Sequence, residues 1–237
     1  MLKKLPKENM GRSNLGWLES RFHFSFAEYY NPKNMHFGVL RVVNDDIVHP
    51  LSGFDMHPHR DMEIISYIVE GEISHKDSMG NSETLKRGEV QYLSAGSGIL
   101  HSEHNLHPSQ DLRLLQIWIL PPKKDLDILY GSYKFKEEER KNKLLNIVSS
   151  KDGNVKIQLY QDVNFYVSEL DAGKSLDYIL GSNRQIYFIQ IEGTSIINEV
   201  QLDDGDAMEI VGESNLHIKA VTNSHFLFIE MPMDYKR

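Results

Sequence analysis

The fold of this chain is decided by residues 53–103, which open with His57-Pro58-His59 and close with Gly96-Ser97-Gly98-Ile99-Leu100-His101-Ser102-Glu103. Successive side chains of a β-strand point to opposite faces, so His57 and His59 look the same way, and so do His101 and Glu103. If folding unites the two pairs, they present three imidazole nitrogens and one carboxylate to a single point. This is a ligand set for one divalent transition metal, with room left for an exogenous ligand.

Composition narrows the functional classes. The chain has 237 residues, which suffices for one large β domain or two smaller ones, each with a sizeable core. Its 26 Lys and Arg against 34 Asp and Glu give a net charge of -8, so nothing predicts a nucleic-acid binder. The absence of cysteine excludes disulfides and thiolate ligands, so a metal must sit on nitrogen and oxygen. No apolar run has the length of a signal peptide core or a membrane span, and we expect a soluble cytoplasmic protein.

Short strands separated by Gly, Asp and Asn turns predict an all-β sandwich or barrel. Residues Asp77–Asn81, DSMGN, are typical of a tight hairpin loop between two of these strands. The charged run Lys136–Lys141 predicts a solvated helix or linker at a domain boundary. Strand patterns resume beyond it, so the chain is expected to contain two β domains.

A weak internal repeat favours two copies of one unit. Glu70-Gly71-Glu72 followed by Gly88-Glu89 is echoed by Glu192-Gly193-Thr194 followed by Gly205-Asp206. The second copy has no paired histidines. We therefore expect the C-terminal half to keep the fold without the metal.

The central stretch resembles the pirins of the cupin superfamily, and most closely their bacterial quercetin 2,3-dioxygenase-like members. The resemblance is carried by His57–Glu63, Gly71, His75–Asn81, Gly88–Gln91 and Ser94–Glu103, with Gly16–Leu18, Phe24–Phe26, Asn44–Asp46 and Gln116–Trp118 in support. It is close over about the first 120 residues. The C-terminal half matches only as a degenerate second cupin.

The resemblance implies an all-β bicupin, in which two antiparallel, jelly-roll-like β-barrel domains contain little helix. Residues 1–135 would form the metal-binding cupin, and residues 136–237 a degenerate cupin without metal ligands. The implied metal ligands are His57, His59, His101 and Glu103. The wider cupin pattern takes its carboxylate from a residue shortly after the paired histidines, and Glu63 occupies that place. The pirin pattern favours Glu103 as the ligand and leaves Glu63 to orient an imidazole from behind.

The function that the resemblance implies is metal-dependent dioxygenase activity on a flavonol such as quercetin, with dioxygen as co-substrate and Glu103 as general base. Iron is the first expectation for the metal, and manganese, nickel, copper, cobalt and zinc also suit these ligands. One alternative is a pirin-like metal-dependent regulatory protein without obligatory catalysis, which would use the same ligands. Another is a metal-free small-molecule-binding barrel, against which the full ligand set argues. We expect no direct contact with nucleic acid or membrane. We also expect a monomer, because two cupins in one chain already supply the pairing that single-cupin proteins obtain by dimerising.

Overall fold

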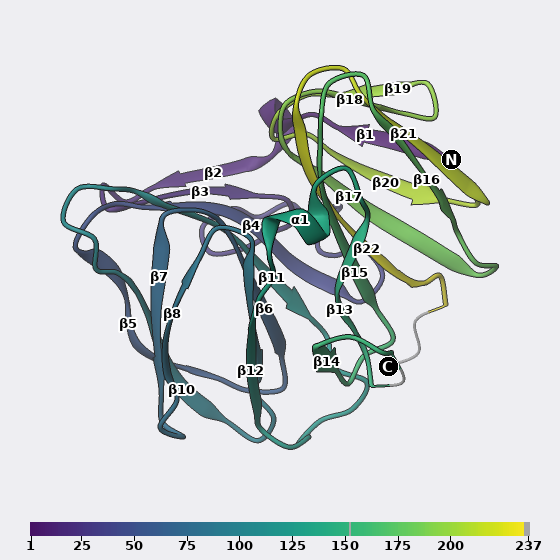
Figure 1. Ribbon diagram of the computed structural model, residues 1–237. Helices are drawn as coiled ribbons and strands as arrows, with labels where there is room; N and C mark the ends of the chain where they lie inside the picture. The colour runs from purple at the N-terminus through teal and green to yellow at the C-terminus, as the bar shows by residue number, and fades with distance from the viewer. Residues whose placement is uncertain (152, 235–237) are drawn as a thin grey trace. The chain divides into compact units, whose positions relative to one another are not determined.

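The computed structural model describes residues 1–151 and 153–234, and it confirms the predicted all-β class (Figure 1). Two compact units make up the chain. The N-terminal unit consists of Gly11–Phe135 and Leu159–Gln161, and the C-terminal unit consists of the described residues of Met1–Met10, Lys136–Gln158 and Asp162–Lys236. No helix in the described residues is long and apolar enough to cross a membrane.

The N-terminal unit is built from two sheets whose neighbouring strands all pair antiparallel. The seven-stranded sheet has, in spatial order, β12 (Leu129–Lys134), β9 (Glu89–Ser94), β6 (Glu63–Glu70), β11 (Leu112–Ile119), β4 (Leu40–Val48), β3 (Leu18–Phe22) and β2 (Gly11–Asn14). The four-stranded sheet has β5 (Ser52–His59), β10 (Ile99–Asn105), β7 (Glu72–Asp77) and β8 (Ser82–Lys86).

Apolar side chains from both sheets of this unit form one buried cluster between them. Ile68 and Leu114 contribute from the seven-stranded sheet, and Ile73 and Leu85 contribute from the four-stranded one. All four are at most 1% exposed. The two sheets therefore pack face to face, and side chains that alternate along their strands are directed either into this interior or away from it.

The C-terminal unit repeats this architecture. Its seven-stranded sheet has β1 (Leu2–Leu5), β20 (Ala207–Val211), β17 (Arg184–Glu192), β22 (Ser224–Pro232), β15 (Asn164–Leu170), β13 (Leu145–Ser150) and β14 (Ile157–Leu159). Its four-stranded sheet has β16 (Ser175–Ile179), β21 (Asn215–Ala220), β18 (Ser195–Ile197) and β19 (Val200–Leu202). A 3-10 turn at Lys7–Asn9 follows β1, and the charged run contains the predicted helix as α1 (Glu137–Arg140).

The repeat seen in the sequence marks equivalent turns of the two units. β6 ends at Glu70 and β17 ends at Glu192, and the glycine that follows each strand has a positive φ, +73° at Gly71 and +74° at Gly193. In both places a Cβ atom would also meet a backbone carbonyl oxygen, of Asp111 or of Asn223. Only glycine fits such a left-handed, closely approached position, so the same residue recurs for the same reason.

The membership of the units differs from a simple division at residue 135 in two places. Leu2–Leu5 pair antiparallel with Ala207–Ile210, which puts the first ten residues in the C-terminal unit. The three residues Leu159–Gln161 lie in the N-terminal unit. The chain therefore enters and leaves each unit more than once.

Candidate metal centre

Three of the four residues predicted as ligands come together on two neighbouring strands. β5 carries His57 and His59 on one face, and β10 lies beside it with His101 directly opposite His57. The centroid of the His57 ring lies 4.8 Å from that of His59 and 4.5 Å from that of His101, and the last two centroids are 4.8 Å apart. Each ring offers a nitrogen within 4.8 Å of the other two, which is close enough to share one ion.

Local sequence explains how the two strands present these rings. Pro58 lacks a backbone N–H, and β5 tolerates it because it is an edge strand of the four-stranded sheet. Gly96 and Gly98 have positive φ, +43° and +134°, in the turn that leads into β10. Glycine adopts such positive φ values readily, so the chain can turn sharply before the second histidine-bearing strand.

Glu103, the predicted fourth ligand, is buried and held by the seven-stranded sheet. Its Oε1 accepts from Gln91 Nε2 at 3.0 Å, and its Oε2 accepts from Gln116 Nε2 at 2.8 Å. Ser66 Oγ lies 3.2 Å from Oε1 and 3.1 Å from Gln116 Oε1, and its single proton serves one of them at a time. These three residues stand opposite one another on β9, β6 and β11, so a polar row crosses the sheet under the carboxylate.

Two groups in the described part of the chain could each hold a metal ion, and they share His101. The first is His57, His59 and His101, and the second is His75, His101 and Glu103. His101 and Glu103 are 1% and 3% exposed, whereas His57 and His59 are partly exposed. The centre thus has a side toward solvent, made of imidazoles, and a buried side that includes a carboxylate.

His75 is the member of the centre that sequence analysis did not predict. It is fully buried on β7, opposite Glu103 on β10. Its ring stacks on Tyr130 at 4.8 Å and lies 5.5 Å from the His101 ring. The sequence signal that points to His75 is that Asp77, two positions later on the same strand, is directed to the same face of the sheet. In the structure, Asp77 Oδ2 lies 3.4 Å from His75 Nε2.

Glu63 has different partners from those expected of it. It begins β6 three positions before Ser66, so its side chain leaves the sheet on the face opposite the one that meets Glu103. Its carboxylate accepts from Tyr92 Oη at 2.7 Å and from the backbone N–H groups of Tyr160 at 2.7 Å and Gln161 at 3.0 Å. These contacts anchor residues 159–161 to the sheet, and Glu63 belongs to neither of the two groups that could hold a metal.

Burial keeps two imidazoles of the centre uncharged at neutral pH. Burial lowers the pKa of His59 to about 4, with smaller contributions from His101 and His57. Burial likewise lowers the pKa of His101 to about 3, with smaller contributions from His57 and His75. Neutral imidazoles have free lone pairs, which is the form that binds metal ions.

The residues present fit a divalent transition metal. Both ring nitrogens of His101 are buried and have no hydrogen-bond partner in the protein. A buried polar atom without a partner is rare, and a metal ion would satisfy one of these two nitrogens. The two groups offer imidazole nitrogens and one carboxylate, a nitrogen and oxygen donor set that iron, nickel, copper, manganese, cobalt and zinc accept.

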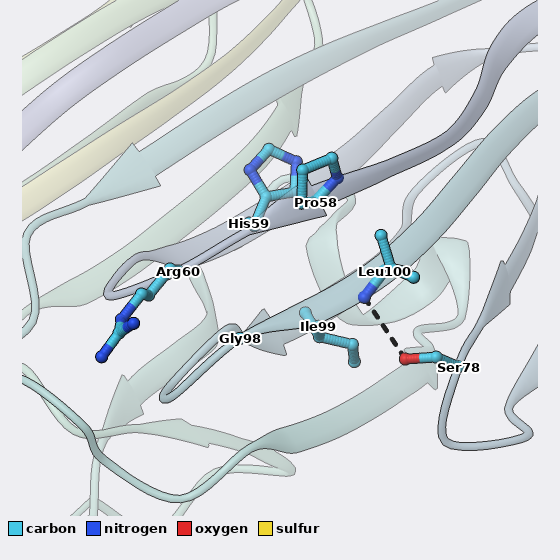
Figure 2. Close-up of a pocket in the computed structure, with 7 residues that line it drawn as sticks. All are labelled: Pro58, His59, Arg60, Ser78, Gly98, Ile99 and Leu100. Atoms are coloured by element: carbon cyan, nitrogen blue, oxygen red, sulfur yellow. Dashed lines mark hydrogen bonds between the residues drawn. The ribbon is translucent and has the colours of Figure 1, made fainter.

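A cavity of about 510 Å³ adjoins the centre, and His59 is part of its wall (Figure 2). Its lining residues are Pro58, His59, Arg60, Ser78, Gly98, Ile99 and Leu100. Figure 2 shows Leu100 and Ser78 close together, where the backbone N–H of Leu100 donates to Ser78 Oγ at 3.3 Å, while Arg60 extends away from them. The volume lies in the range of small-molecule sites.

Aromatic side chains that contact His59 fix the orientation of its ring. The ring of Trp118 meets that of His59 edge-on, with centroids 4.8 Å apart and planes at 85°. Phe26 in turn meets Trp118 at 5.3 Å and 86°. These contacts hold the imidazole in one orientation before any ligand binds.

The corresponding place in the C-terminal unit is apolar. Both four-stranded sheets have the same strand order, so β16 and β21 correspond to β5 and β10. Their inward positions carry Tyr178 opposite Leu216 and Leu176 opposite Ile218, all in or against the hydrophobic core. His217, on the same strand, is exposed and pairs with Asp177 at 2.8 Å.

Comparison with known proteins agrees with this architecture. The pirin family model matches residues 5–119, and the model of the quercetinase C-terminal cupin domain matches residues 146–231. A curated protein of Escherichia coli K12 named quercetin 2,3-dioxygenase is 37% identical over 222 residues, which are 94% of this chain and 95% of that protein. A pirin-like protein of Caulobacter vibrioides is 37% identical over 231 residues, which are 97% of this chain and 99% of that protein.

Among solved structures, the bacterial pirin YhhW from Escherichia coli in complex with nickel(II) superimposes with a TM-score of 0.92 at 34% identity. The match covers 98% of this chain and 99% of that one. Full-length similarity at this identity, two successive family matches and a shared all-β cupin fold lead to one conclusion. The chain belongs to the pirin family, and its relatives include bacterial quercetin 2,3-dioxygenases.

Proposed function

We propose that this protein is a metal-dependent dioxygenase that cleaves a flavonol such as quercetin. The observations that carry the proposal are the group of three imidazoles at His57, His59 and His101, the buried, hydrogen-bonded carboxylate of Glu103 next to His101, and a cavity of small-molecule size whose wall includes His59. The name of the Escherichia coli relative, quercetin 2,3-dioxygenase, supports this activity and substrate class. The reaction consumes dioxygen, opens the central ring and releases carbon monoxide.

The proposed ligands are His57, His59, His101 and Glu103. A divalent transition metal bound there supplies Lewis acidity, which lowers the pKa of a coordinated hydroxyl group, and a site at which dioxygen reacts. The related YhhW structure is a complex with nickel(II), which supports metal binding by this chain, and iron remains our first proposal for oxygen chemistry.

The residues of this chain bind and orient the substrate and move its proton. The cavity beside His59 accepts a planar aromatic molecule, with Ile99 and Leu100 as its apolar wall. The flavonol hydroxyl group gives its proton to Glu103, which acts as general base. Gln91 and Gln116 hold the Glu103 carboxylate by their amide groups, so its oxygens are oriented before the substrate arrives.

The test is dioxygen uptake and carbon monoxide release with quercetin, measured on protein reconstituted separately with iron, manganese, nickel, copper and cobalt. Wild type should turn over with at least one metal, and His57→Ala should bind less metal and lose activity. Glu103→Gln should retain metal better than His57→Ala, yet lose turnover. Metal binding without uptake for every metal would refute the enzyme proposal and favour the regulatory alternative, and full activity in Glu103→Gln would refute the role of that carboxylate as base.

A further inference from the structure

His75, His101 and Glu103 form a group of potential ligands distinct from the three-imidazole group. One donor atom of each lies within 4.8 Å of the donors of the other two. His75 is 0% exposed, His101 is 1% exposed and Glu103 is 3% exposed, so this group lies on the buried side of the centre. It shares only His101 with the group that includes His57 and His59.

The His75 ring has a nitrogen available for an ion. Its Nδ1 is buried and has no hydrogen-bond partner in the protein. Its Nε2 is 3.4 Å from Asp77 Oδ2, which is long for a hydrogen bond. Asp77 does not depend on this contact, because its carboxylate already accepts from Met79 N at 2.9 Å, Asn81 N at 3.0 Å and Asn81 Nδ2 at 2.7 Å.

The position of the ring is fixed although its Nδ1 has no hydrogen-bond partner. Tyr130 stacks on His75 with planes at 15° and centroids 4.8 Å apart, and the strand pairing of β7 with β10 sets His75 opposite Glu103. A buried imidazole with an unpartnered nitrogen costs free energy unless something satisfies it. The arrangement therefore has the form of a preorganised ligand rather than of a packed core residue.

We propose that the metal centre has two overlapping positions, the outer one at the ligands of the proposed function, His57, His59, His101 and Glu103, and an inner one at which His75 joins His101 and Glu103. This inference rests on the metal site of the proposed function and adds a ligand to it. Because His101 is shared, one ion occupies one position at a time. The negative charge of Glu103 offsets the charge of a buried divalent ion, and two imidazoles select a transition metal over calcium or magnesium.

The inner position would keep the metal bound to the protein when His57 and His59 dissociate from it. His57 and His59 are the partly exposed ligands, and His59 lines the cavity, so these two are the ligands that an incoming molecule can displace. An ion that shifts toward His75 and Glu103 stays bound to protein by three donors. His75 would thus act on metal retention, in addition to any effect on turnover.

The test is metal binding by calorimetry with Co²⁺ and Zn²⁺, together with the visible absorption spectrum of bound Co²⁺. His57→Ala/His59→Ala, which removes the outer position, should still bind one ion per chain, with affinity weakened at least tenfold. Adding His75→Phe, which keeps an aromatic ring against Tyr130, should abolish binding and the Co²⁺ absorption bands. His49→Phe serves as matched control, because His49 is a partly exposed imidazole 2.8 Å from Asp111, outside the centre.

Circular dichroism verifies that each variant is folded, and His57→Gln/His59→Gln replaces the alanine pair if that pair unfolds. A folded outer-position variant that binds no ion would overturn the inner position while leaving the proposed function intact, provided that wild type binds metal and consumes dioxygen. Retention of the ion after His75→Phe is added would overturn it as well. If wild type binds no transition metal at all, the proposed function and this inference fail together.

Discussion

Replacing Gln116 with Leu should weaken metal binding about 10- to 100-fold. The Gln116 amide donates to Glu103 Oε2 at 2.8 Å, and a hydrogen bond to a charged group contributes about 1.5–3 kcal/mol. Because this bond already exists in the metal-free protein, the loss of affinity comes from the lost orientation of Glu103, and removing a group that orients a metal ligand typically costs a factor of about 10 to 100. Ser66 can then give its proton to Glu103 alone, so we expect the lower end of the range.

Leu fills nearly the volume of Gln, so the change removes the donor with little effect on packing. The assay is competition titration of the metal-free variant with a chromophoric chelator, alongside urea unfolding to verify stability. The matched control is Gln185→Leu, because Gln185 is 7% exposed against 9% for Gln116 and its amide also donates at 2.9 Å, to Pro232 O in the C-terminal unit. Wild-type metal affinity in a folded Gln116→Leu variant would refute the idea that the polar row orients Glu103 for a metal.

Three further changes probe the scaffold. Glu63→Gln should lower the free energy of unfolding by about 1–3 kcal/mol, because the new amide group would face the backbone N–H of Gln161. Metal affinity should be unchanged, and a tenfold loss of affinity would contradict the placement of Glu63 outside the metal centre. Burial lowers the pKa of His23 to about 4, so this side chain takes up its proton at a higher pH in the unfolded chain than in the folded one, and the stability of the wild type should fall as pH drops from about 6.5 toward 4. The loss of unfolding free energy between pH 7 and 4, measured by urea unfolding, should be smaller in His23→Gln by up to about 3 kcal/mol. An equal loss in both proteins would contradict this role of His23. In Gly53→Ala the new Cβ would meet the Glu103 carbonyl oxygen, so β10 must shift and metal affinity should fall at least tenfold in the folded variant, as the same chelator titration can check.

Strand alternation was enough to predict how His57 and His59 share one face, because both lie within a single uninterrupted strand. Strand alternation does not extend from His59 to Glu63. Residues 60–62 lead from β5 in the four-stranded sheet to β6 in the seven-stranded one, and Asp61 takes a positive φ of +50° in that turn. Parity counts side-chain directions only along one strand, so it could not be carried through the turn to Glu63.

His75 illustrates a different limit. Its place beside Glu103 follows from the register of β7 against β10, which long-range packing sets and which one sequence does not reveal. The hairpin loop that follows it was predictable: β7 ends at Asp77 and β8 begins at Ser82, as the residues DSMGN indicated. A turn can be predicted from its own residues, whereas the residue that lies opposite on a neighbouring strand cannot.

The pairing of β1 with β20 has a consequence for the order in which the chain folds. Leu2–Leu5 are synthesised long before their partner strand Ala207–Val211, so β1 must wait without a partner until that strand has been made. The entropy of closing so long a loop grows only slowly with length, by about 0.6 kcal/mol per doubling, so the delay is chiefly one of time. In the finished sheet β1 covers an edge of β20 that would otherwise be open to pairing with other chains, and β1 becomes the edge strand in its place.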